Sequence, residues 1–205
     1  ALLIAANNRG KRVLILTYNS GLKEETREKV KRYGLDNAEA HSFHAFLKCY
    51  YNPCRNDEEM KQIVESGSSP TRKFKFDIVV VDECQDLDAL KHKMLIRTVF
   101  ANNQAENVLL VIVGDKCQCI YQFYGADERY LTYAPEAFDV STRLWKNLPL
   151  HHSWRLSILV SNFINRVLLK GETRLKSCKH VDCKVEYYTV DLLQYADSGR
   201  SEVLD

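Results

Sequence analysis

The sequence predicts an α/β protein built on a parallel sheet with helices on both faces. Two short apolar runs, Ile78–Val81 and Val108–Gly114, have the length and β-branched content of strands buried on both faces. The helix-length segment Leu87–Phe100 separates them, which is the spacing of a parallel βαβ crossover. A third apolar run, Arg12–Thr17, is followed by a helical pattern over Leu22–Tyr33, so strands and helices alternate along the chain.

The N-terminal part of the chain reads as helix, strand, helix and short strand. Ala1–Asn7 has the pattern of the last turns of a helix, and turn residues follow it. The apolar positions of Leu22–Tyr33 share one helix face, and Gly34 is expected to end that helix. Ala38–Ser42 is predicted to be a short strand that leads into a helix over Phe43–Tyr51.

Polar and basic segments fill the space before the run Ile78–Val81. Asp57–Ser66 is predicted to be a polar helix, and the glycine- and proline-containing stretch Gly67–Pro70 breaks the pattern after it. The basic segment Arg72–Lys75 is interpreted as a solvated loop. The chain between the helix Phe43–Tyr51 and the run Ile78–Val81 is too short to contain an additional helical domain.

The last third of the sequence predicts further short elements. Asp127–Tyr133 is expected to be a capped helical turn that Pro135 ends, and Arg143–Leu150 alternates like a strand. An amphipathic helix over Ile158–Leu168 follows, and Lys184–Val190 alternates like a half-buried strand. The helix is expected to turn four apolar side chains inward: Ile158, Phe163, Ile164 and Val167.

The composition is that of an ordinary intracellular globular protein. Of its 205 residues, 45% are hydrophobic and 27% are charged, and the formal net charge is only +2, so any basic surface must be local. No apolar run approaches the ~20 residues of a membrane span, and no signal-peptide pattern is present, so we expect no membrane partner. Seven cysteines without a regular framework indicate reduced thiols, and we expect a location in the cytoplasm or nucleus, not secretion.

Carboxylates follow both of the buried runs. Asp82 and Glu83 come directly after Ile78–Val81, and Asp115 follows Val108–Gly114. Open parallel sheets bind their ligands at the carboxyl ends of the strands. One acid of such a pair can hold a divalent metal ion while its neighbour polarises a water molecule. The alternative is that Asp82 only caps the following helix, with Glu83 in its first turn.

The two acidic strand ends belong to longer motifs. VVVDECQD over Val79–Asp86 and VGDKCQCIYQFYGA over Val113–Ala126 together resemble motifs II and III of the UvrD/Rep (PcrA-like) helicases of superfamily one. Weaker matches extend the resemblance from Leu14 to about Leu168. It implies a RecA-like parallel sheet, ATP and Mg²⁺ as cofactors, and a role as an ATP-dependent DNA helicase, with DNA repair as a typical setting.

The resemblance assigns a phosphoryl-transfer role to several residues. Asp82 would hold Mg²⁺ on the β- and γ-phosphates, and Glu83 would orient and deprotonate the attacking water. Gln85 and Gln118 would hydrogen-bond the water or the γ-phosphate, because an amide offers both a donor and an acceptor. In the region that resembles motif IV, Arg155 is the candidate arginine finger and Trp154 would stack on adenine. The alternative for these last two residues is a cation–π or packing pair.

Other residues match nucleic-acid contacts of the same helicases. Tyr18 lies in the motif Ia region and would touch a base. Ser42 and His44 lie in HSFHAF, which resembles motif Ib, and would reach a phosphate. Tyr121 and Phe123 would stack on unpaired bases of single-stranded or partly duplex DNA. The alternatives are core or strand-end packing for the aromatic residues and a surface or capping role for His44.

The domain expectation follows from the motifs that are present and those that are not. Residues 1–155 are expected to be the first RecA-like, ATP-binding domain, and residues 156–205 the start of a second one. No G-x-x-x-x-G-K-[ST] loop and no motifs V and VI occur in the 205 residues. The chain is therefore interpreted as an internal fragment that does not hydrolyse ATP by itself, whereas its full-length parent does.

Two other interpretations stay open. The first is a non-catalytic, helicase-derived module that binds nucleic acid without hydrolysing ATP. The second is another P-loop nucleotide hydrolase in which the second motif is a coincidence. Translocation polarity, the choice between DNA and RNA, and protein partners do not follow from the sequence.

Overall fold

A computed structural model describes residues 1–139, 145–170 and 174–179. The chain divides into two compact units, Ala1–Trp145 and Lys146–Asp205. The predicted domain boundary, between residues 155 and 156, falls inside a strand of the second unit.

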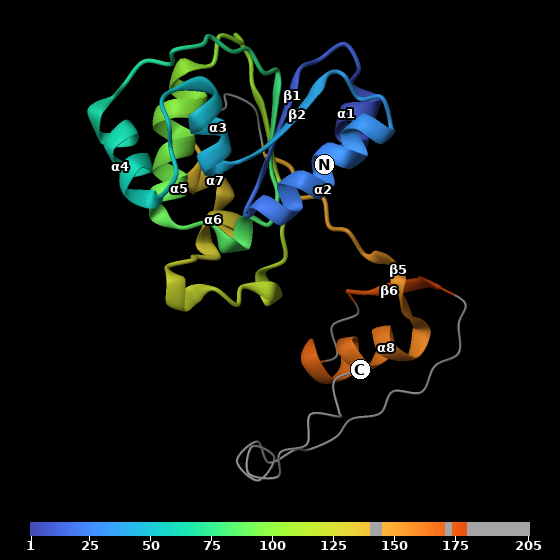
Figure 1. Cartoon of the computed structure of the whole chain (residues 1–205). Coiled ribbons are helices and arrows are strands. Elements are labelled where there is room, and N and C mark those ends of the chain that lie inside the picture. The colour runs from blue at the N-terminus through green and yellow to red at the C-terminus, as the bar shows by residue number, and fades with distance from the viewer. Residues whose placement is uncertain (140–144, 171–173, 180–205) are drawn as a thin grey trace, which may run out of the picture. The chain divides into compact units, whose positions relative to one another are not determined.

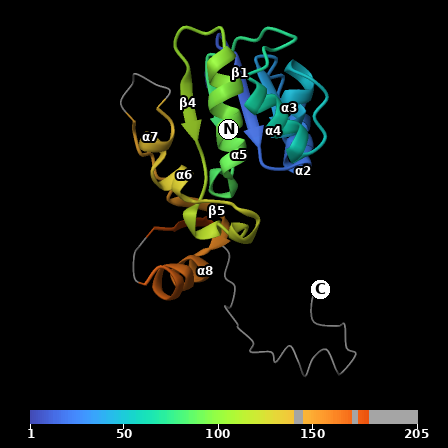
Figure 2. The same cartoon turned by 90° about the vertical axis from the view of Figure 1, so that its left-hand side faces the viewer.

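The first unit is built on a four-stranded sheet in which every neighbouring pair is parallel (Figures 1 and 2). The strand order is β2-β1-β3-β4, so β1 and β3 are central and the other two strands form the edges. The strands span β1 Val13–Thr17, β2 Ala38–Ser42, β3 Ile78–Val81 and β4 Leu109–Ile112. With helices on both faces, this sheet confirms the predicted α/β, RecA-like fold class.

Helices follow the strands in the predicted order. Capping side chains begin several of them: Asn19, Ser42, Asn56 and Asp88 each accept a hydrogen bond from a backbone N–H in the first turn. Gly34 and Gly67 adopt positive φ angles where two helices end. The helices span α1 Leu2–Asn7, α2 Ser20–Arg32, α3 Phe43–Tyr50, α4 Asp57–Ser66, α5 Ala89–Met94 (which continues as a π-helix, η2, over Leu95–Phe100), α6 Arg129–Thr132 and α7 Ala134–Ala137.

The strands alternate their side chains between two cores. Leu14 and Leu16 of β1 face a large core, which they share with Val79 and Val81 of β3 and with side chains of α3, α4 and α5. The other face of the same strands packs against α1 and the apolar side of α2, and it includes Val13, Ile15, Ile78 and Val80. Figure 1 shows α1 and α2 on one side of the sheet and α3, α4 and α5 on the other. Runs of β-branched residues form strands here because both faces are covered.

Two details of the first unit differ from the sequence-based expectation. Pro135 does not end a helical turn; it lies in the first turn of α7, where its missing N–H and fixed φ suit a helix start. β4 is only partly buried, although its sequence resembles that of β3. β4 lies at one edge of the sheet, but β2 lies at the other edge and is mostly buried, so edge position alone does not set the burial of a strand.

The second unit has a small parallel pair of strands and one helix. β5 spans His152–Ser157, β6 spans Lys176–Lys179, and α8 spans Ile158–Phe163 and continues as a π-helix over Ile164–Leu168. The Asn165 side chain holds the approach to β6 through the backbone N–H and C=O of Leu175, at 3.0 and 2.9 Å.

Three predictions for this region have different outcomes. A strand over Arg143–Leu150 was wrong for its described part, residues 145–150, since the strand begins at His152. The predicted inward face of the helix was wrong for Ile158 and Val167, which are exposed, while Ser161 and Asn165 are buried. Asn165 faces inward because its side chain bonds the backbone of Arg174 and Leu175, a signal that hydrophobic periodicity does not contain. The predicted strand Lys184–Val190 lies outside the described residues.

Across the described ranges, no helix has the combination of length and apolar character that a bilayer crossing requires.

Candidate functional site

Three of the predicted catalytic residues, Glu83, Gln85 and Gln118, lie at the carboxyl edge of the four-stranded sheet. Asp82 and Glu83 follow β3, and Asp115 follows β4 after a short link. Because β3 and β4 are parallel neighbours, these side chains emerge at the same edge. Figure 2 shows the segment after β4 at the end of the sheet to which the strand arrows point.

Glu83 has a backbone conformation that is uncommon for its residue type. Its φ is 54° and its ψ is 45°, in the left-handed region that favours glycine. The chain is held on both sides of it, because Asp82 N–H donates to Leu16 O at 2.9 Å and Cys84 N–H donates to Val113 O at 3.0 Å. Such strain of ~1–3 kcal/mol persists where the surrounding structure fixes it, and it is concentrated at functional sites.

Gln85 joins the two motifs through both ends of its side-chain amide. Its Nε2 donates a hydrogen bond of 2.7 Å to Oε2 of Glu83. Its Oε1 accepts a hydrogen bond of 3.1 Å from the backbone N–H of Asp115. The side chain is only 2% exposed, so these bonds form away from solvent. Gln85 therefore fixes the position of the Glu83 carboxylate instead of pointing into open space.

Gln118 reaches this arrangement indirectly. Its Nε2 donates a hydrogen bond of 2.9 Å to Oδ2 of Asp115, and the Cys117 N–H donates one of 3.0 Å to Oδ1 of the same carboxylate. Asp115 therefore holds the short 3₁₀ turn η3 over Lys116–Gln118. The connection from Gln118 to Glu83 runs through Asp115 and Gln85. A direct contact of Gln118 with a γ-phosphate stays a prediction.

Gly114 is required by this close packing. A Cβ atom at this position would lie 2.5 Å from Oε1 of Gln85 and 3.2 Å from the backbone nitrogen of Cys84. Any side chain here would push Gln85 away from Asp115. The motif has glycine at this position because any side chain would occupy the space of the buried Gln85 amide.

Asp82 is suited to a hard divalent cation. Its partly buried carboxyl has a raised pKa, chiefly because of burial, and the neighbouring Glu83 charge raises it further. One carboxylate oxygen accepts the Glu83 N–H at 3.2 Å. Among the described residues, no group of three His, Cys, Asp or Glu side chains is placed to hold a metal ion. A single protein carboxylate fits Mg²⁺, which usually takes its other ligands from phosphates and water.

Aromatic side chains form a second cluster beside the acids. The Tyr18 and Tyr121 rings stack with centroids 5.5 Å apart and an interplanar angle of 21°. Phe123 lies 6.3 Å from Tyr121 and 4.4 Å from Tyr124. Phe123 and Tyr124 are about three-quarters exposed, so their rings are accessible to a ligand. We call Tyr18, Tyr121, Phe123 and Tyr124 the aromatic cluster.

Charged residues pack against Tyr18. The Lys91 ammonium lies 5.5 Å from the centroid of the Tyr18 ring and is paired with Asp88. Asp86 is buried, its Oδ1 atom bonds none of the described residues, and burial, followed by Glu83, raises its pKa. The hydroxyl of Tyr18 also has a raised pKa, mainly because of burial, with Lys91 lowering it and Asp86 raising it. Tyr18 therefore connects the turn over Asp82–Asp86, which we call the acidic turn, to Tyr121 of the aromatic cluster.

Ser42 and His44 are engaged in contacts within the protein. The Ser42 hydroxyl is buried and accepts the Ala45 N–H at 3.4 Å, as the cap of α3. His44 Nε2 lies 2.9 Å from Oδ1 of Asp57 in α4. Ser42 is thus the cap of α3, His44 pairs with an acid of α4, and a phosphate contact from either residue stays a prediction.

Trp154 and Arg155 lie in β5 of the second unit. Trp154 is 80% exposed, and Arg155 is exposed as well. The Arg155 N–H donates to the Ser153 hydroxyl at 3.3 Å, which holds the backbone between them. Both side chains are exposed in their own unit, so the roles predicted for them depend on partners outside it.

A comparison with protein families gives a match over the first part of the chain. A family described as an AAA domain matches residues 1–124, more than half of the chain. The chain belongs to this AAA domain family. AAA domains are nucleotide-dependent and generally bind ATP with Mg²⁺, and this type of domain occurs in UvrD/Rep-like helicases. No protein with a curated function matches the chain.

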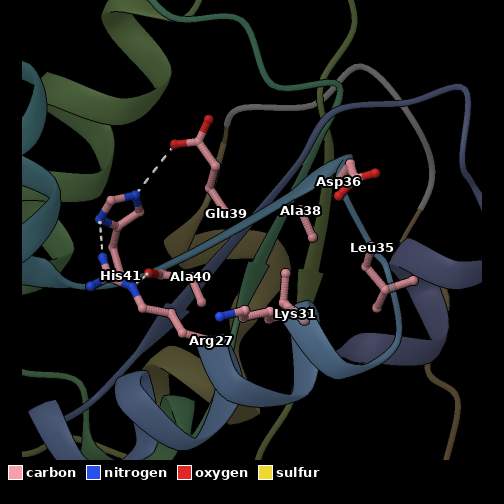
Figure 3. A pocket seen from close by; sticks show the side chains of 9 residues that line it. Arg27, Lys31, Leu35, Asp36, Ala38, Glu39, Ala40 and His41 are labelled. Carbon is pink, nitrogen blue, oxygen red and sulfur yellow. Dashed lines mark hydrogen bonds and ion pairs between the residues drawn. The ribbon is translucent and has the colours of Figure 1, made fainter.

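The AAA domain match covers most of the carboxyl edge. It includes β1 to β4, both acidic strand ends, and the aromatic cluster as far as Tyr124. A hollow of about 380 Å³ lies elsewhere, between α2 and the edge strand β2 (Figure 3). Arg27 spans that hollow, donating to Ala40 O at 2.7 Å and lying 3.2 Å from His41 Nδ1. None of the residues predicted for catalysis or DNA binding lines it.

Three residues of this AAA domain site were not among the predicted site residues. Asp115 was noted only as a strand-end acid, although its position after β4 was a usable signal. Tyr124 adds a ring to the aromatic cluster, and its neighbours in sequence, Tyr121 and Phe123, pointed to it. Lys91 has no signal in the sequence, because a nearly buried lysine is recognised only from its position over the Tyr18 ring.

Proposed function

We propose that the chain is part of a UvrD-like, ATP-dependent DNA helicase, in which nucleotide hydrolysis drives movement along single-stranded DNA. The observation that supports this most is the hydrogen-bonded connection from Glu83 through Gln85 to Asp115. The segment that begins at Asp115 continues directly into the aromatic cluster at Tyr121 and Phe123. The segment Asp115–Phe123 therefore contacts Gln85 of the acidic turn at one end and carries exposed rings at the other.

On the nucleotide side, each acidic residue has a separate task. Asp82 would hold Mg²⁺, which when bound neutralises phosphate charge during phosphoryl transfer. Glu83 would accept a proton from the attacking water, and its carboxylate is already held in place by the Gln85 amide. A change at the γ-phosphate that moves Glu83 would be transmitted by Gln85 to the backbone of Asp115.

On the DNA side, the exposed rings of Tyr121, Phe123 and Tyr124 suit stacking on unpaired bases. Stacking is tolerant of base sequence, which a motor that steps along any strand requires. Tyr18 would contribute once its stack with Tyr121 opens. Ser42 and His44 would contact a phosphate after exchanging their present internal partners.

Two residues of the second unit have proposed roles toward the nucleotide. Arg155 would stabilise charge on the transferring phosphoryl group, as arginine fingers do, with an effect of ~10³–10⁵ on the rate. Trp154 would stack on the adenine base. The exposure of both side chains is compatible with these roles.

The DNA-binding part of the proposal is tested on the chain itself. Binding of a fluorescein-labelled dT oligonucleotide is measured by anisotropy for the wild type, Phe123→Ala and Tyr121→Ala. Each variant is expected to bind about 5- to 150-fold more weakly, because one stacked base contributes ~1–3 kcal/mol. Tyr33→Ala is the matched control, since Tyr33 is an exposed tyrosine outside the aromatic cluster. Equal affinity of all four proteins would contradict the proposal.

The catalytic part is tested on the product of the complete gene. Glu83→Gln keeps the shape of the side chain but removes the proton acceptor, so DNA-stimulated ATP hydrolysis is expected to fall about 10²- to 10⁴-fold. Binding of the dT oligonucleotide should not change. A wild-type protein that binds this oligonucleotide but does not hydrolyse ATP would instead be a non-catalytic nucleic-acid-binding module.

A further inference from the structure

The amino edge of the sheet, opposite the acidic turn, carries a group of basic residues. They come from the segments before the two central strands, and the backbone brings these segments side by side. Asp77 N–H donates to Arg12 O at 2.9 Å, and Arg12 N–H donates to a carboxylate oxygen of Asp77 at 2.8 Å. We define the basic edge as Lys11, Arg12, Arg72, Lys73 and Lys75.

The segment that carries three of these residues is fixed in place. Phe74 and Phe76 are buried in the large core, which turns Lys73 and Lys75 outward to solvent. The Asn103 side chain bonds both the N–H and the C=O of Phe76, at 2.9 and 2.8 Å. The segment is a solvent-exposed loop, as the sequence predicts, and the buried Phe74 and Phe76 fix the backbone that carries the lysines.

Arginine side chains extend the same surface. The Arg72 guanidinium lies 5.0 Å from the centroid of the Tyr50 ring, and the Arg12 guanidinium lies 5.4 Å from that of Phe76. These aromatic contacts fix the direction of two flexible side chains. Within the described residues, the only ion pair of the basic edge joins Arg12 to Glu39. Most of its positive charge is therefore available to a partner.

The charge of the first unit is separated between the two ends of the sheet. The carboxyl edge holds Asp82, Glu83, Asp86 and Asp115, whereas the basic edge lies at the other ends of the same strands. The formal net charge of +2 does not reveal this separation, because it only sums the charges. The amino edge therefore attracts a polyanion.

The surroundings of the basic edge favour one class of polyanion. None of the large exposed hydrophobic side chains in the described residues lies in residues 9–12 or 71–77. A protein partner usually requires an apolar centre to its interface, and a single-stranded nucleic acid usually requires exposed rings for its bases. A duplex presents phosphates and keeps its bases stacked inside, so it needs only cations.

We propose that the basic edge binds the phosphate backbone of double-stranded nucleic acid, independently of base sequence. This contact is separate from the proposed single-strand site, because it lies at the opposite edge of the sheet. Lys73 and Lys75 contribute charge from an anchored backbone, and Lys11, Arg12 and Arg72 widen the surface. The duplex has its own binding surface on the first unit.

The test measures how salt affects binding of a 20-base-pair DNA duplex to the 205-residue chain. The variant Lys73→Gln/Lys75→Gln is expected to lower the slope of log K against log salt by about 0.9 for each phosphate that the removed charges neutralise. Its affinity at low salt should fall at least about tenfold. The matched control is Lys61→Gln/Lys93→Gln, which removes the same charge from exposed lysines of α4 and α5. The control should bind the duplex as the wild type does.

Several results would overturn the proposal. The first is equal duplex binding by the wild type and the Lys73/Lys75 variant. The second is an affinity for the duplex that falls as much in the Lys61/Lys93 control as in the Lys73/Lys75 variant. The third is no duplex binding by the wild type at low salt. Poly-glutamate binding that depends on Lys73 and Lys75, without duplex binding, would assign the edge to an acidic protein instead. Phe123→Ala separates the two sites, since it should weaken dT binding and leave duplex binding unchanged. Loss of duplex binding in Phe123→Ala alone would place the duplex at the aromatic cluster.

Discussion

The Gln85 amide donates a hydrogen bond of 2.7 Å to the Glu83 carboxylate. The Gln85 side chain is buried where the segment after β3 contacts the segment after β4. It gives the glutamine a role that differs from the predicted contact with water or phosphate. An amide is required here because one end must donate to a carboxylate while the other accepts from the Asp115 N–H.

Replacing Gln85 by glutamate tests this requirement. Gln85→Glu keeps the size of the side chain but places a second carboxylate against Glu83, so we expect the free energy of unfolding at pH 7 to fall by about 2–4 kcal/mol. The two carboxylates raise each other's pKa, and the variant should regain stability as the pH is lowered. Urea unfolding at several pH values measures both effects. Gln118→Glu is the matched control, because Gln118 is exposed; a decrease as large there would contradict the explanation.

Gly114→Ala tests the packing around the same amide from the other side. The added methyl group would lie 2.5 Å from Oε1 of Gln85, so the side chain must move and lose its bond to Asp115. We expect the free energy of unfolding to fall by about 1–3 kcal/mol. Gly10→Ala has no atom within 4 Å of the new Cβ and should change stability by less than about 0.5 kcal/mol. Equal urea midpoints of the two variants would show that Gln85 is not held as described.

The left-handed conformation of Glu83 predicts an unusual order of stability. Glu83→Gly and Glu83→Ala both remove the carboxylate, but only glycine tolerates a φ of 54° without strain. The glycine variant should therefore be more stable than the alanine variant by about 1 kcal/mol. At Glu28, an exposed glutamate within α2, the same pair should show the reverse order by about the same amount. Thermal unfolding of the four variants gives the comparison, and alanine above glycine at both positions would contradict it.

Much of the fold was predictable because it depends on local pattern. Ile78–Val81 forms a strand through an uninterrupted β-branched run, and Asp57–Ser66 has the bounds that its polar helical pattern predicts. The placement of Asp82 and Glu83 at the sheet edge followed from parallel strand order alone. Strand burial was less predictable, since the partly exposed β4 and the fully buried β3 have similar apolar sequences.

The site was predictable in its members but not in its contacts. Residue types indicated that Glu83, Gln85 and Gln118 act together, yet the backbone strain at Glu83 and the direction of the Gln85 amide arise from tertiary packing. Lys91 could not be identified, because its burial over Tyr18 depends on two segments far apart in sequence. In the second unit, β5 was missed because its polar sequence His152–Ser157 has little strand signal.

The Glu39 carboxylate is expected to contribute to the stability of the fold in a way that depends on pH. Its carboxylate lies 3.4 Å from His41 Nε2, accepts a hydrogen bond from the Tyr50 hydroxyl and pairs with Arg12. The His41 hydrogen bond, followed by the Tyr50 bond and the Arg12 charge, lowers the pKa of Glu39 from 4.5 to about 2 against the effect of burial. A lowered pKa in the folded state means that the carboxylate stabilises the fold above pH 4.5, and that this contribution disappears as the pH falls toward 2.

The difference in unfolding free energy between the wild type and Glu39→Gln should therefore depend on pH in a defined way. It should be constant at about 1–3 kcal/mol from pH 8 to pH 5, allowing for the partial exposure of the side chain. It should shrink through pH 4 and vanish near pH 2. Tyr50→Phe removes one donor to the carboxylate, which raises the pKa of Glu39 and moves the decline to higher pH. Urea midpoints measured between pH 8 and pH 2 follow the difference, and a gap that stays constant to pH 2 would show that Glu39 is not stabilised as a carboxylate.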